Sequence, residues 1–388
     1  MADSRNSAWG PGVAGDVTPG ALAGIRVADF SRVLAGPFAT MLLADLGAEV
    51  TKVERPGVGD ETRTWGPPFD DRGRATYFQA VNRNKLSVAL DFKDAAGNER
   101  ARRLALEADV LFENFRPGLM DEIGLGYDRL RAENPGLIYC SITGFGGGAG
   151  AALPAYDLLV QALGGLMSIT GEPDGDPQKV GVALVDVLAG LFAVVGVLAA
   201  LRHRELTGEG QRVEVDLLSS LLAALVNQAS AHTLAGVVPD RLGNAHPSIA
   251  PYELFRTGQG QLVLAVGNDR QFLALCEALG VAELADDPRF ADNGARVVNR
   301  DALRVALEER LATRGAAEWA ELLTADRVPA GVVNDVGAAF ALAERLGLEP
   351  IVAIARDDGS VARLPRNPIG LSLTPPSYRL PPPQAPGL

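Results

Sequence analysis

Asp157 is the carboxylate whose neighbours in the sequence best suit chemistry. It follows a glycine-rich stretch at residues 144–150 and Pro154, and apolar residues begin directly after it at Leu158. This order predicts a carboxylate at the start of a buried helix, where the helix dipole favours the ionised form. Such a residue can cap the helix, which is a structural role, or act as a carboxylate nucleophile beside the glycine-rich loop. The residues alone leave both interpretations open.

Other reaction classes lack the residues that they need. The chain has neither a G-x-S-x-G nucleophile elbow nor a G-x-x-x-x-G-K-[ST] phosphate loop. Its three histidines, His203, His232 and His246, do not stand at metal-ligand spacing, so no metal site is predicted. Cys140 lies within an apolar run and is interpreted as a small buried hydrophobic residue rather than a nucleophile.

One motif introduces a nicotinamide oxidoreductase as an alternative. Residues 144–149, GFGGGA, match the G-x-G-x-x-A pattern after a predicted strand. A dinucleotide site requires this loop to open directly into a helix, whereas Gly150 and Pro154 follow the motif here. We therefore expect a loop at this point and no nicotinamide site.

Composition narrows the classes of partner. The chain has 388 residues and a formal net charge of −12, which argues against binding to nucleic acid or to an anionic membrane. Two cysteines cannot form a disulfide framework, which favours a reduced, cytoplasmic location. The longest apolar run, residues 187–201, is shorter than the roughly 20 residues that span a bilayer. It predicts a buried helix and no membrane segment.

Strand-like and helix-like segments alternate in the first half of the chain. Short runs that are apolar, or that alternate between apolar and polar residues, predict strands at residues 25–30, 49–53, 85–90, 108–112, 137–142 and 211–216. Helical spacing predicts helices at 37–46, 95–107 and 217–234, and a largely helical region at 156–201 broken at 171–177. This alternation predicts an α/β fold with a parallel sheet between helices. An antiparallel strand pair at 252–266 and helices at 271–279 and 301–311 predict a second, smaller domain.

Collinear motifs cover most of the chain. They include DFSRVLAGP at residues 29–37, LADLGAEV at 43–50, KVERPG at 52–57, NRNK at 82–85, LDFK at 90–93, ENFRPG at 113–118, Tyr156-Asp157, TGEPDG at 170–175 and TGEGQ at 207–211. In this order they resemble the class III CoA-transferases, also called family III, the carnitine, bile-acid and formyl-CoA transferase type. The resemblance extends from about residue 24 to about residue 375.

The resemblance implies a reaction and a nucleophile. Asp157 falls on the family's catalytic aspartate, which attacks an acyl-CoA thioester to form a mixed anhydride and then an aspartyl-CoA thioester. CoA is thereby moved from an acyl-CoA donor to a small free carboxylic acid. Coenzyme A is a substrate in this scheme, and no tightly bound cofactor is expected.

The resemblance also implies which residues bind CoA. Basic residues would meet the adenosine phosphates, loop residues would line the site through their backbone, and the others would hold the nucleotide and the pantetheine arm. The implied cofactor-binding residues are Val33, Ala35, Arg55, Leu90, Lys93, Asn114, Phe115 and Arg116. A basic residue common in the family after Met120-Asp121 is Glu122 here, so one phosphate contact departs from the pattern.

The implied fold is an interlocked homodimer. Each subunit has a Rossmann-like large α/β domain built from both chain ends and a smaller α+β domain reached by long linkers. Applied to this sequence, this gives a flexible tail at 1–20, the large domain with the catalytic aspartate at 21–205 and a linker at 206–228. The small domain follows at 229–330, and residues 331–388 form a linker and return to the large domain.

Two alternatives share the ability to bind CoA. An α-methylacyl-CoA racemase or epimerase of the same fold uses the aspartate and an upstream histidine as its two acid/base groups, but no histidine precedes His203 here. A CoA-binding protein without turnover is the non-enzymatic alternative, and the intact Asp157 argues against it. The transferase is the function that the sequence favours.

Overall fold

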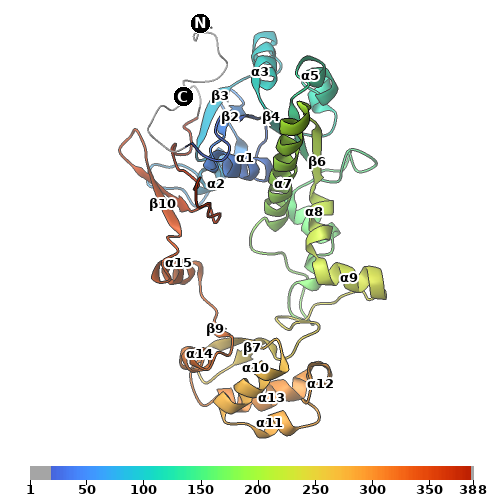
Figure 1. Ribbon diagram of the computed structural model, residues 1–388, viewed down its shortest axis with the longest axis vertical. Coiled ribbons are helices and arrows are strands. Elements are labelled where there is room, and N and C mark those ends of the chain that lie inside the picture. Colours follow the sequence, from blue (N-terminus) through green and yellow to red (C-terminus); the bar gives the residue numbers. More distant parts are fainter. Residues whose placement is uncertain (1–18, 386–388) are drawn as a thin grey trace. The chain divides into compact units, whose positions relative to one another are not determined.

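The computed structural model describes residues 19–385 of the chain. These residues form two compact units, shown in Figure 1. The larger unit combines the chain up to Leu166 with Lys179–Val237 and the segment from Glu349 onward, and the smaller unit combines Met167–Gln178 with Val238–Leu348. Most of the predicted tail, residues 1–18, lies outside the described residues.

A six-stranded sheet forms the centre of the larger unit. Its strands are β1 (Arg26–Asp29), β2 (Glu49–Glu54), β3 (Lys85–Ala89), β4 (Val110–Glu113), β5 (Ile138–Thr143) and β6 (Arg212–Asp216). The strand order is β3-β2-β1-β4-β5-β6, and every neighbouring pair is parallel. This is the order of doubly wound nucleotide-binding folds. The α/β fold class predicted from the sequence is confirmed.

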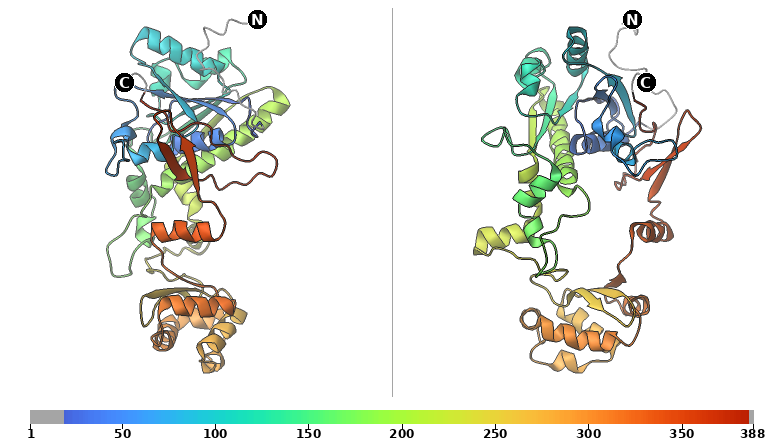
Figure 2. Two further views of the ribbon diagram at one scale, coloured as in Figure 1. Left: turned by 90° about the vertical axis from the view of Figure 1, so that its left-hand side faces the viewer. Right: turned by 180° about the vertical axis from the view of Figure 1, so that it is seen from behind.

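Helices cover both faces of this sheet, as Figure 2 shows. The larger unit holds α1 (Ala35–Asp45), α2 (Thr76–Ala80), α3 (Ala95–Glu107), α4 (Leu119–Glu122), α5 (Tyr127–Glu133), α6 (Asp157–Leu163), α7 (Leu184–Thr207), α8 (Leu217–Ala224) and α9 (Val226–Ala235). Strand residues alternate between two hydrophobic cores: Val110 and Phe112 pack with α1 and α7, whereas Leu111 packs with α3 and α5. This two-residue period is why short apolar runs predicted the strands correctly.

Helix α7 is the long apolar helix of the larger unit. It is the one helix among the described residues that is long and apolar enough to cross a membrane, and 44% of its most apolar window is buried inside the protein. One stripe, including Ala189, Ala193 and Val197, is fully buried and packs on α1 and the sheet. Phe192 and Val195 on another face are 42% and 64% exposed. The sequence predicted burial for the whole run, and the structure buries one face of it.

The end of the chain packs against the larger unit. Strands β10 (Ile351–Ala355) and β11 (Val361–Pro365) form an antiparallel hairpin. Asp45 makes a buried ion pair of 2.6 Å with Arg83, which also donates a hydrogen bond of 2.9 Å to the Pro365 carbonyl. Asn84 donates to the Ser377 carbonyl at 2.7 Å. These contacts join the two chain ends in one unit, as the resemblance implied.

The smaller unit is an α+β structure. Its sheet has the order β7-β8-β9, formed by β7 (Tyr252–Arg256), β8 (Gln261–Ala265) and β9 (Ala330–Val332), with antiparallel neighbours. Its helices are α10 (Asp269–Leu279), α11 (Glu283–Asp286), α12 (Asn293–Val298), α13 (Arg300–Leu311), α14 (Ala316–Ala325) and α15 (Val336–Arg345). A hydrophobic core around Trp319 and Phe272 joins the sheet to the helices.

Three sequence expectations differ from the structure. The single helix expected at 217–234 is wrong, because Val226 has a φ of +41° and the segment divides into α8 and α9 at that point. The region 156–201 is less helical than expected, since α6 and α7 are separated by residues 164–183. Residues 167–178 belong to the smaller unit, whereas the sequence placed them in the large domain.

Candidate active site

The predicted CoA-binding residues gather where the strand order of the sheet reverses. Val33 and Ala35 follow β1, and Asn114, Phe115 and Arg116 follow β4, the strand next to β1. In open parallel sheets, the loops after two such strands diverge and leave a crevice at the carboxyl edge. The fold therefore brings together two sequence motifs that lie about 80 residues apart.

Asn114 and Val33 fix the loop after β1. The Asn114 side chain accepts a hydrogen bond of 2.8 Å from the Arg32 amide and donates one of 2.8 Å to the Arg32 carbonyl. Val33 has a φ of +68°, a costly conformation for a β-branched residue, and its amide donates to Asp60 Oδ2 at 3.3 Å. The loop is thus held in one shape by side chains from other elements.

A buried ionic cluster lies beneath this loop. Lys52 pairs with Asp60 at 2.9 Å and donates to the Ser31 carbonyl at 2.8 Å, while Lys85 pairs with Asp29 at 3.0 Å. Burial alone would raise the pKa of Asp29, but Lys85 and Lys52 hold this pKa below its ordinary value. Burial lowers the pKa of Lys85 to about 8. Breaking such a cluster would leave an unpaired buried charge, so the cluster keeps the loop rigid.

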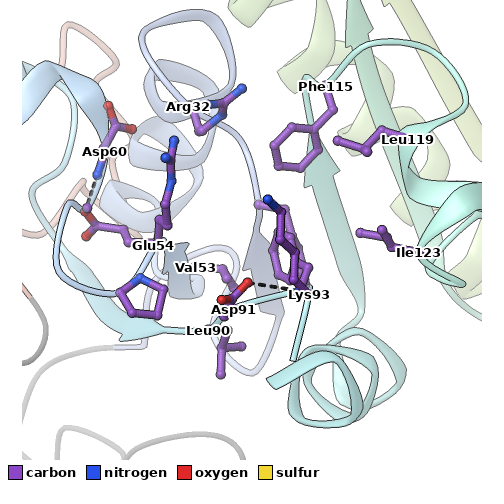
Figure 3. A pocket seen from close by; sticks show the side chains of 15 residues that line it. Arg32, Val53, Glu54, Asp60, Leu90, Asp91, Lys93, Phe115, Leu119 and Ile123 are labelled. Atoms are coloured by element: carbon purple, nitrogen blue, oxygen red, sulfur yellow. Dashed lines mark hydrogen bonds between the residues drawn. The ribbon is translucent and has the colours of Figure 1, made fainter. Parts of the chain in front are cut away.

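Cavity A, with a volume of about 530 Å³, lies on one side of this loop. The predicted CoA-binding residues Arg55, Leu90, Lys93 and Phe115 all line it. Figure 3 shows Lys93 and Phe115 across the cavity from Glu54 and Asp60. Arg55 and Lys93 are exposed to solvent, whereas Leu90 is buried. The cavity combines exposed cations with apolar walls, a combination suited to an anionic ligand with an apolar or aromatic part.

Cavity B, of about 260 Å³, adjoins cavity A through two shared residues, Arg32 and Phe115. Its lining includes the remaining predicted residues, Val33, Ala35, Asn114 and Arg116. The Arg32 guanidinium lies 5.1 Å from the centre of the Phe115 ring, a cation–π contact. Arg32 was not among the predicted site residues, although it stands between Phe30 and Val33 in the same motif.

Asp157 is buried next to cavity B, with 9% of its surface exposed. It is the first residue of α6, and its carboxylate does not cap that helix. Instead, Oδ1 accepts hydrogen bonds from the Val185 amide at 2.8 Å and the Asp186 amide at 3.4 Å, in the first turn of α7. Oδ2 accepts a hydrogen bond of 2.7 Å from Gln161. The N-cap interpretation is therefore wrong for α6, because the carboxylate binds the N-terminus of a different helix.

Gln161 keeps the Asp157 carboxylate in place. Its side chain is fully buried, and it lies four residues after Asp157, on the same side of α6. Its Nε2 donates to Asp157, and its Oε1 accepts a hydrogen bond of 2.9 Å from the Val180 amide. The four-residue spacing was a signal in the sequence that could have identified Gln161.

Comparison with protein families decides what this site belongs to. A family model described as CoA-transferase family III matches residues 22–387. The chain belongs to this family. Both the family and the enzyme class predicted from the sequence, a CoA-transferase of the EC 2.8.3 type, are confirmed.

Curated relatives of this CoA-transferase match over most of its length. It is 45% identical to a succinate–glutarate CoA-transferase of Agrobacterium fabrum, over 94% of this chain and 92% of the relative. It is 42% identical to an acetyl-CoA:oxalate CoA-transferase of Acetobacter aceti, over 90% and 88% of the two chains.

Solved structures match equally widely. A CaiB/BaiF family protein from Brucella suis superposes with a TM-score of 0.83 at 44% identity, covering 94% of this chain and 96% of that one. A protein from Mycobacterium tuberculosis gives a TM-score of 0.86 at 34% identity, covering 95% and 98%.

The CoA-transferase has a second carboxylate beside Asp157 that sequence reasoning did not select. Asp186 lies in the first turn of α7 and lines cavity B. Burial, together with the negative charge of Asp157, raises the pKa of Asp186 to about 7. Burial and the charges of Asp186, Asp157 and Asp60 also raise the pKa of Tyr77 to about 12. In the sequence, Asp186 stands out only as an acid at the start of the long apolar run.

The glycine-rich loop does not open a helix. After β5 ends at Thr143, no helix begins before α6 at Asp157. Gly144 lines cavity B, whereas Gly147 and Gly148 lie on a different cavity lined also by Glu113 and Tyr139. This arrangement lacks the helix that a nicotinamide site needs at this loop, so nothing in it favours the oxidoreductase alternative.

Arg116 is an exposed predicted cation, with 60% of its side chain accessible. It donates hydrogen bonds to both carboxylate oxygens of Glu122, at 2.8 Å for one of them. Glu122 is the residue that departs from the family pattern. The pair is solvent-exposed and already satisfied, which distinguishes Arg116 from Arg55 and Lys93 in cavity A.

Proposed function

We propose that this protein moves CoA from an acyl-CoA donor to a free carboxylic acid through covalent intermediates on Asp157. The carboxylate attacks the acyl carbon, the C–S bond breaks, and a mixed anhydride and CoA are formed. The CoA sulfur then attacks the Asp157 carbonyl, releasing the donor acid and leaving an aspartyl-CoA thioester. The acceptor acid reverses these two steps and leaves with CoA.

The observation that carries the proposal is the environment of Asp157. Three donors, from Gln161, Val185 and Asp186, hold an almost fully buried carboxylate beside cavity B. The N-terminus of a 24-residue helix favours its negative charge. A fixed and desolvated carboxylate is a better nucleophile than one in water, and burial protects the anhydride from hydrolysis.

CoA would occupy both cavities in this proposal. Arg55 and Lys93 at cavity A would bind the adenosine phosphates, while Leu90 and Phe115 would contact the nucleotide. The pantetheine arm would pass Arg32 and Phe115, which are common to both cavities, and reach cavity B. There the backbone of Val33 and Ala35 and the side chains of Asn114 and Arg116 line the space.

We further propose succinyl-CoA as a donor and a small dicarboxylic acid as the acceptor. Several relatives between 42% and 45% identical are named for succinyl-CoA or succinate and a second small acid such as glutarate or mesaconate. A racemase would need a second acid/base group opposite Asp157. No histidine is among the described residues that line cavity A or cavity B.

A homodimer and a cytoplasmic location complete the proposal. Large apolar side chains are exposed on α7 and α9, including Val195, Val226 and Leu234 at 64%, 66% and 87%. Exposed apolar residues in such density are typical of a surface that binds another protein chain. The two free, buried cysteines fit a reducing compartment. Sedimentation at micromolar concentration tests the dimer.

Trapping with hydroxylamine tests the covalent route. The protein is incubated with succinyl-CoA and hydroxylamine, digested, and the peptide that holds Asp157 is analysed by mass spectrometry. A hydroxamate on Asp157 that depends on succinyl-CoA is expected, together with its absence in Asp157→Asn. Asp71→Asn changes an exposed aspartate and serves as the matched control. Absence of the hydroxamate with every acyl-CoA tried, combined with exchange of α-protons in heavy water, would replace the transferase by a racemase.

A further inference from the structure

We propose that Asp186 is a second catalytic carboxyl group, which gives a proton to the sulfur of the departing CoA and recovers it when that sulfur returns. The proposal rests on the proposed function, because it requires Asp157 to be the nucleophile. Asp186 was not among the site residues predicted from the sequence.

The position of Asp186 places it beside the reacting atoms. Its backbone amide lies 3.4 Å from Asp157 Oδ1, so the two residues are direct neighbours across α6 and α7. Its side chain lines cavity B together with Val33 and Tyr156. Within residues 19–385, its carboxylate has neither a hydrogen-bond partner nor an ion pair. A substrate in cavity B can therefore reach it.

The helix does not need Asp186 as a cap. Asp157 already accepts hydrogen bonds from the first turn of α7. Placing a second, unpaired carboxylate against Asp157 opposes folding through desolvation and like-charge repulsion. A group that costs stability and serves no structural contact is a strong candidate for a chemical role.

The charged groups around Asp186 explain its protonation. Asp157 faces Asp186 from α6, and burial, together with the charges of both acids, raises the pKa of Tyr77 on α2. Among the charged residues on the lining of cavity B, Arg32 is paired with Glu61 at 3.1 Å and Arg116 with Glu122. These cations are already partnered, so burial and Asp157 dominate and raise the pKa of Asp186 to about 7. A protonated Asp186 is therefore well populated at neutral pH, where an ordinary aspartate would be ionised.

The first chemical step uses this proton. An Asp157 oxygen bonds to the acyl carbon, the C–S bond breaks, and its electron pair goes to sulfur. The Asp186 proton moves to that sulfur, giving neutral CoA thiol and an Asp186 carboxylate. Asp157 has lost its charge in the anhydride, so its repulsion no longer adds to burial in holding the proton on Asp186. A thiol, with an ordinary pKa of about 8.5, then keeps the proton more tightly than Asp186 does.

The second step returns the proton. The Asp186 carboxylate takes it from the thiol as the sulfur attacks the Asp157 carbonyl carbon. The anhydride C–O bond to the Asp157 carbonyl breaks, and the donor acid leaves as a carboxylate. Asp186 is protonated again and no net proton has entered or left. The acceptor acid passes through the same two steps in reverse.

The pH dependence of the full-length enzyme gives the first test. Transfer from succinyl-CoA to glutarate is measured between pH 5.5 and 9 for wild type, Asp186→Asn and Asp186→Glu. In wild type, kcat/KM is expected to fall as pH rises through about 7, because free enzyme loses the Asp186 proton. Asp186→Asn is expected to lose roughly 10²–10³-fold in kcat, with KM within about threefold, and to lose this pH limb. Asp186→Glu is expected to restore the limb.

The leaving group gives the second test. A succinyl thioester of an acidic thiophenol releases a thiolate that needs no proton, so the difference between wild type and Asp186→Asn is expected to shrink below about fivefold. A variant damaged only in structure would lose activity equally with both thioesters.

The results of these experiments distinguish failure of the role of Asp186 from failure of the proposed function. A wild-type rate and pH profile in Asp186→Asn, or an equal loss with both thioesters, would overturn the role of Asp186. Loss of the Asp157 hydroxamate in wild type would instead overturn the proposed function. If Asp186→Asn does not fold by circular dichroism, Asp186→Glu takes its place. A folded Asp186→Glu that lacks the pH limb would contradict the proposal.

Discussion

Cavities A and B share two lining residues, but the predicted phosphate-binding cations of cavity A are exposed to water, whereas the two aspartates at cavity B are partly or almost fully buried. In cavity A the predicted ligands of the phosphates, Arg55 and Lys93, are exposed to water. In cavity B the lining residue Asp186 is half-buried, and its neighbour Asp157 is almost fully buried. Exposed charges attract a ligand weakly and are screened by salt, whereas buried charges interact strongly and cost stability. The difference separates recognition of the substrate from its chemistry.

The buried Asp157 beside cavity B also has a structural role. Asp157 links α6 to the N-terminus of α7, so it holds two helices together as well as carrying the proposed chemistry. Removing its carboxylate leaves the Val185 amide without its acceptor and removes one of the hydrogen bonds of Gln161. For this reason asparagine, which keeps an acceptor oxygen, is a better test of chemistry than alanine. Within residues 19–385, no comparable link is made by Arg55 in cavity A, whose side chain is exposed.

The largest expected effect on stability comes from Asp186, and it measures what a partly buried carboxyl group costs the folded protein. Its pKa is raised from an ordinary 3.8 to about 7, so the folded state binds more protons than the unfolded state between these values. Stability therefore falls as pH rises through this window. Asp186→Asn is expected to raise the free energy of unfolding by about 2–4 kcal/mol at pH 8, and to change it little near pH 4. Urea unfolding at both pH values measures the difference; an equal effect at pH 4 and pH 8 would contradict it.

Gln161→Leu is expected to have the next largest effect. It removes one donor to Asp157 and leaves the Val180 amide unpaired in the interior, which costs about 1–3 kcal/mol of stability. Because the nucleophile loses a positioning contact, kcat is expected to fall roughly 10–50-fold while KM for the acyl-CoA changes little. Gln211→Leu replaces an exposed glutamine and is the matched control. A change confined to KM would show that Gln161 acts in binding rather than in positioning.

Arg55→Ala and Lys93→Ala test whether the exposed cations of cavity A act in substrate binding. Each is expected to raise KM for succinyl-CoA about 3–10-fold, leave kcat within about twofold, and lose most of its effect in 0.5 M salt. The melting temperature should not move, because both side chains are exposed. Arg103→Ala, an exposed arginine on α3 outside both cavities, is the control. A fall in kcat as large as the rise in KM would break the separation between the two cavities.

Arg116→Ala is expected to have the smallest effect. Its guanidinium is exposed and already paired with Glu122, so its removal should change KM for succinyl-CoA less than twofold and leave kcat unchanged. Glu122→Gln frees Arg116 and provides the complementary measurement. A clear increase of KM in Arg116→Ala would mean that CoA displaces Glu122 from this pair.

Local patterns predicted individual elements well. The helix expected at residues 95–107 is α3, Ala95–Glu107, because Asp94 caps it and its apolar residues keep helical spacing. The division at Val226 was missed, since a positive φ at a valine is imposed by the packing of the chain around it and leaves no mark in the pattern. Asp186 was missed for a similar reason, as an acid before an apolar run is ordinarily solvated.

The sequence by itself determined the family and the α/β class, and it named a candidate nucleophile and eight residues that line the two cavities. These follow from residue types and local spacing, which are the same in the unfolded chain. Only the tertiary structure decided how Asp157 is held, since its contacts to Val185 and Asp186 span 28 and 29 residues. It also decided that the half-buried Asp186 lies next to Asp157. Both depend on how α6 packs on the start of α7, and such packing arises only when the whole unit folds.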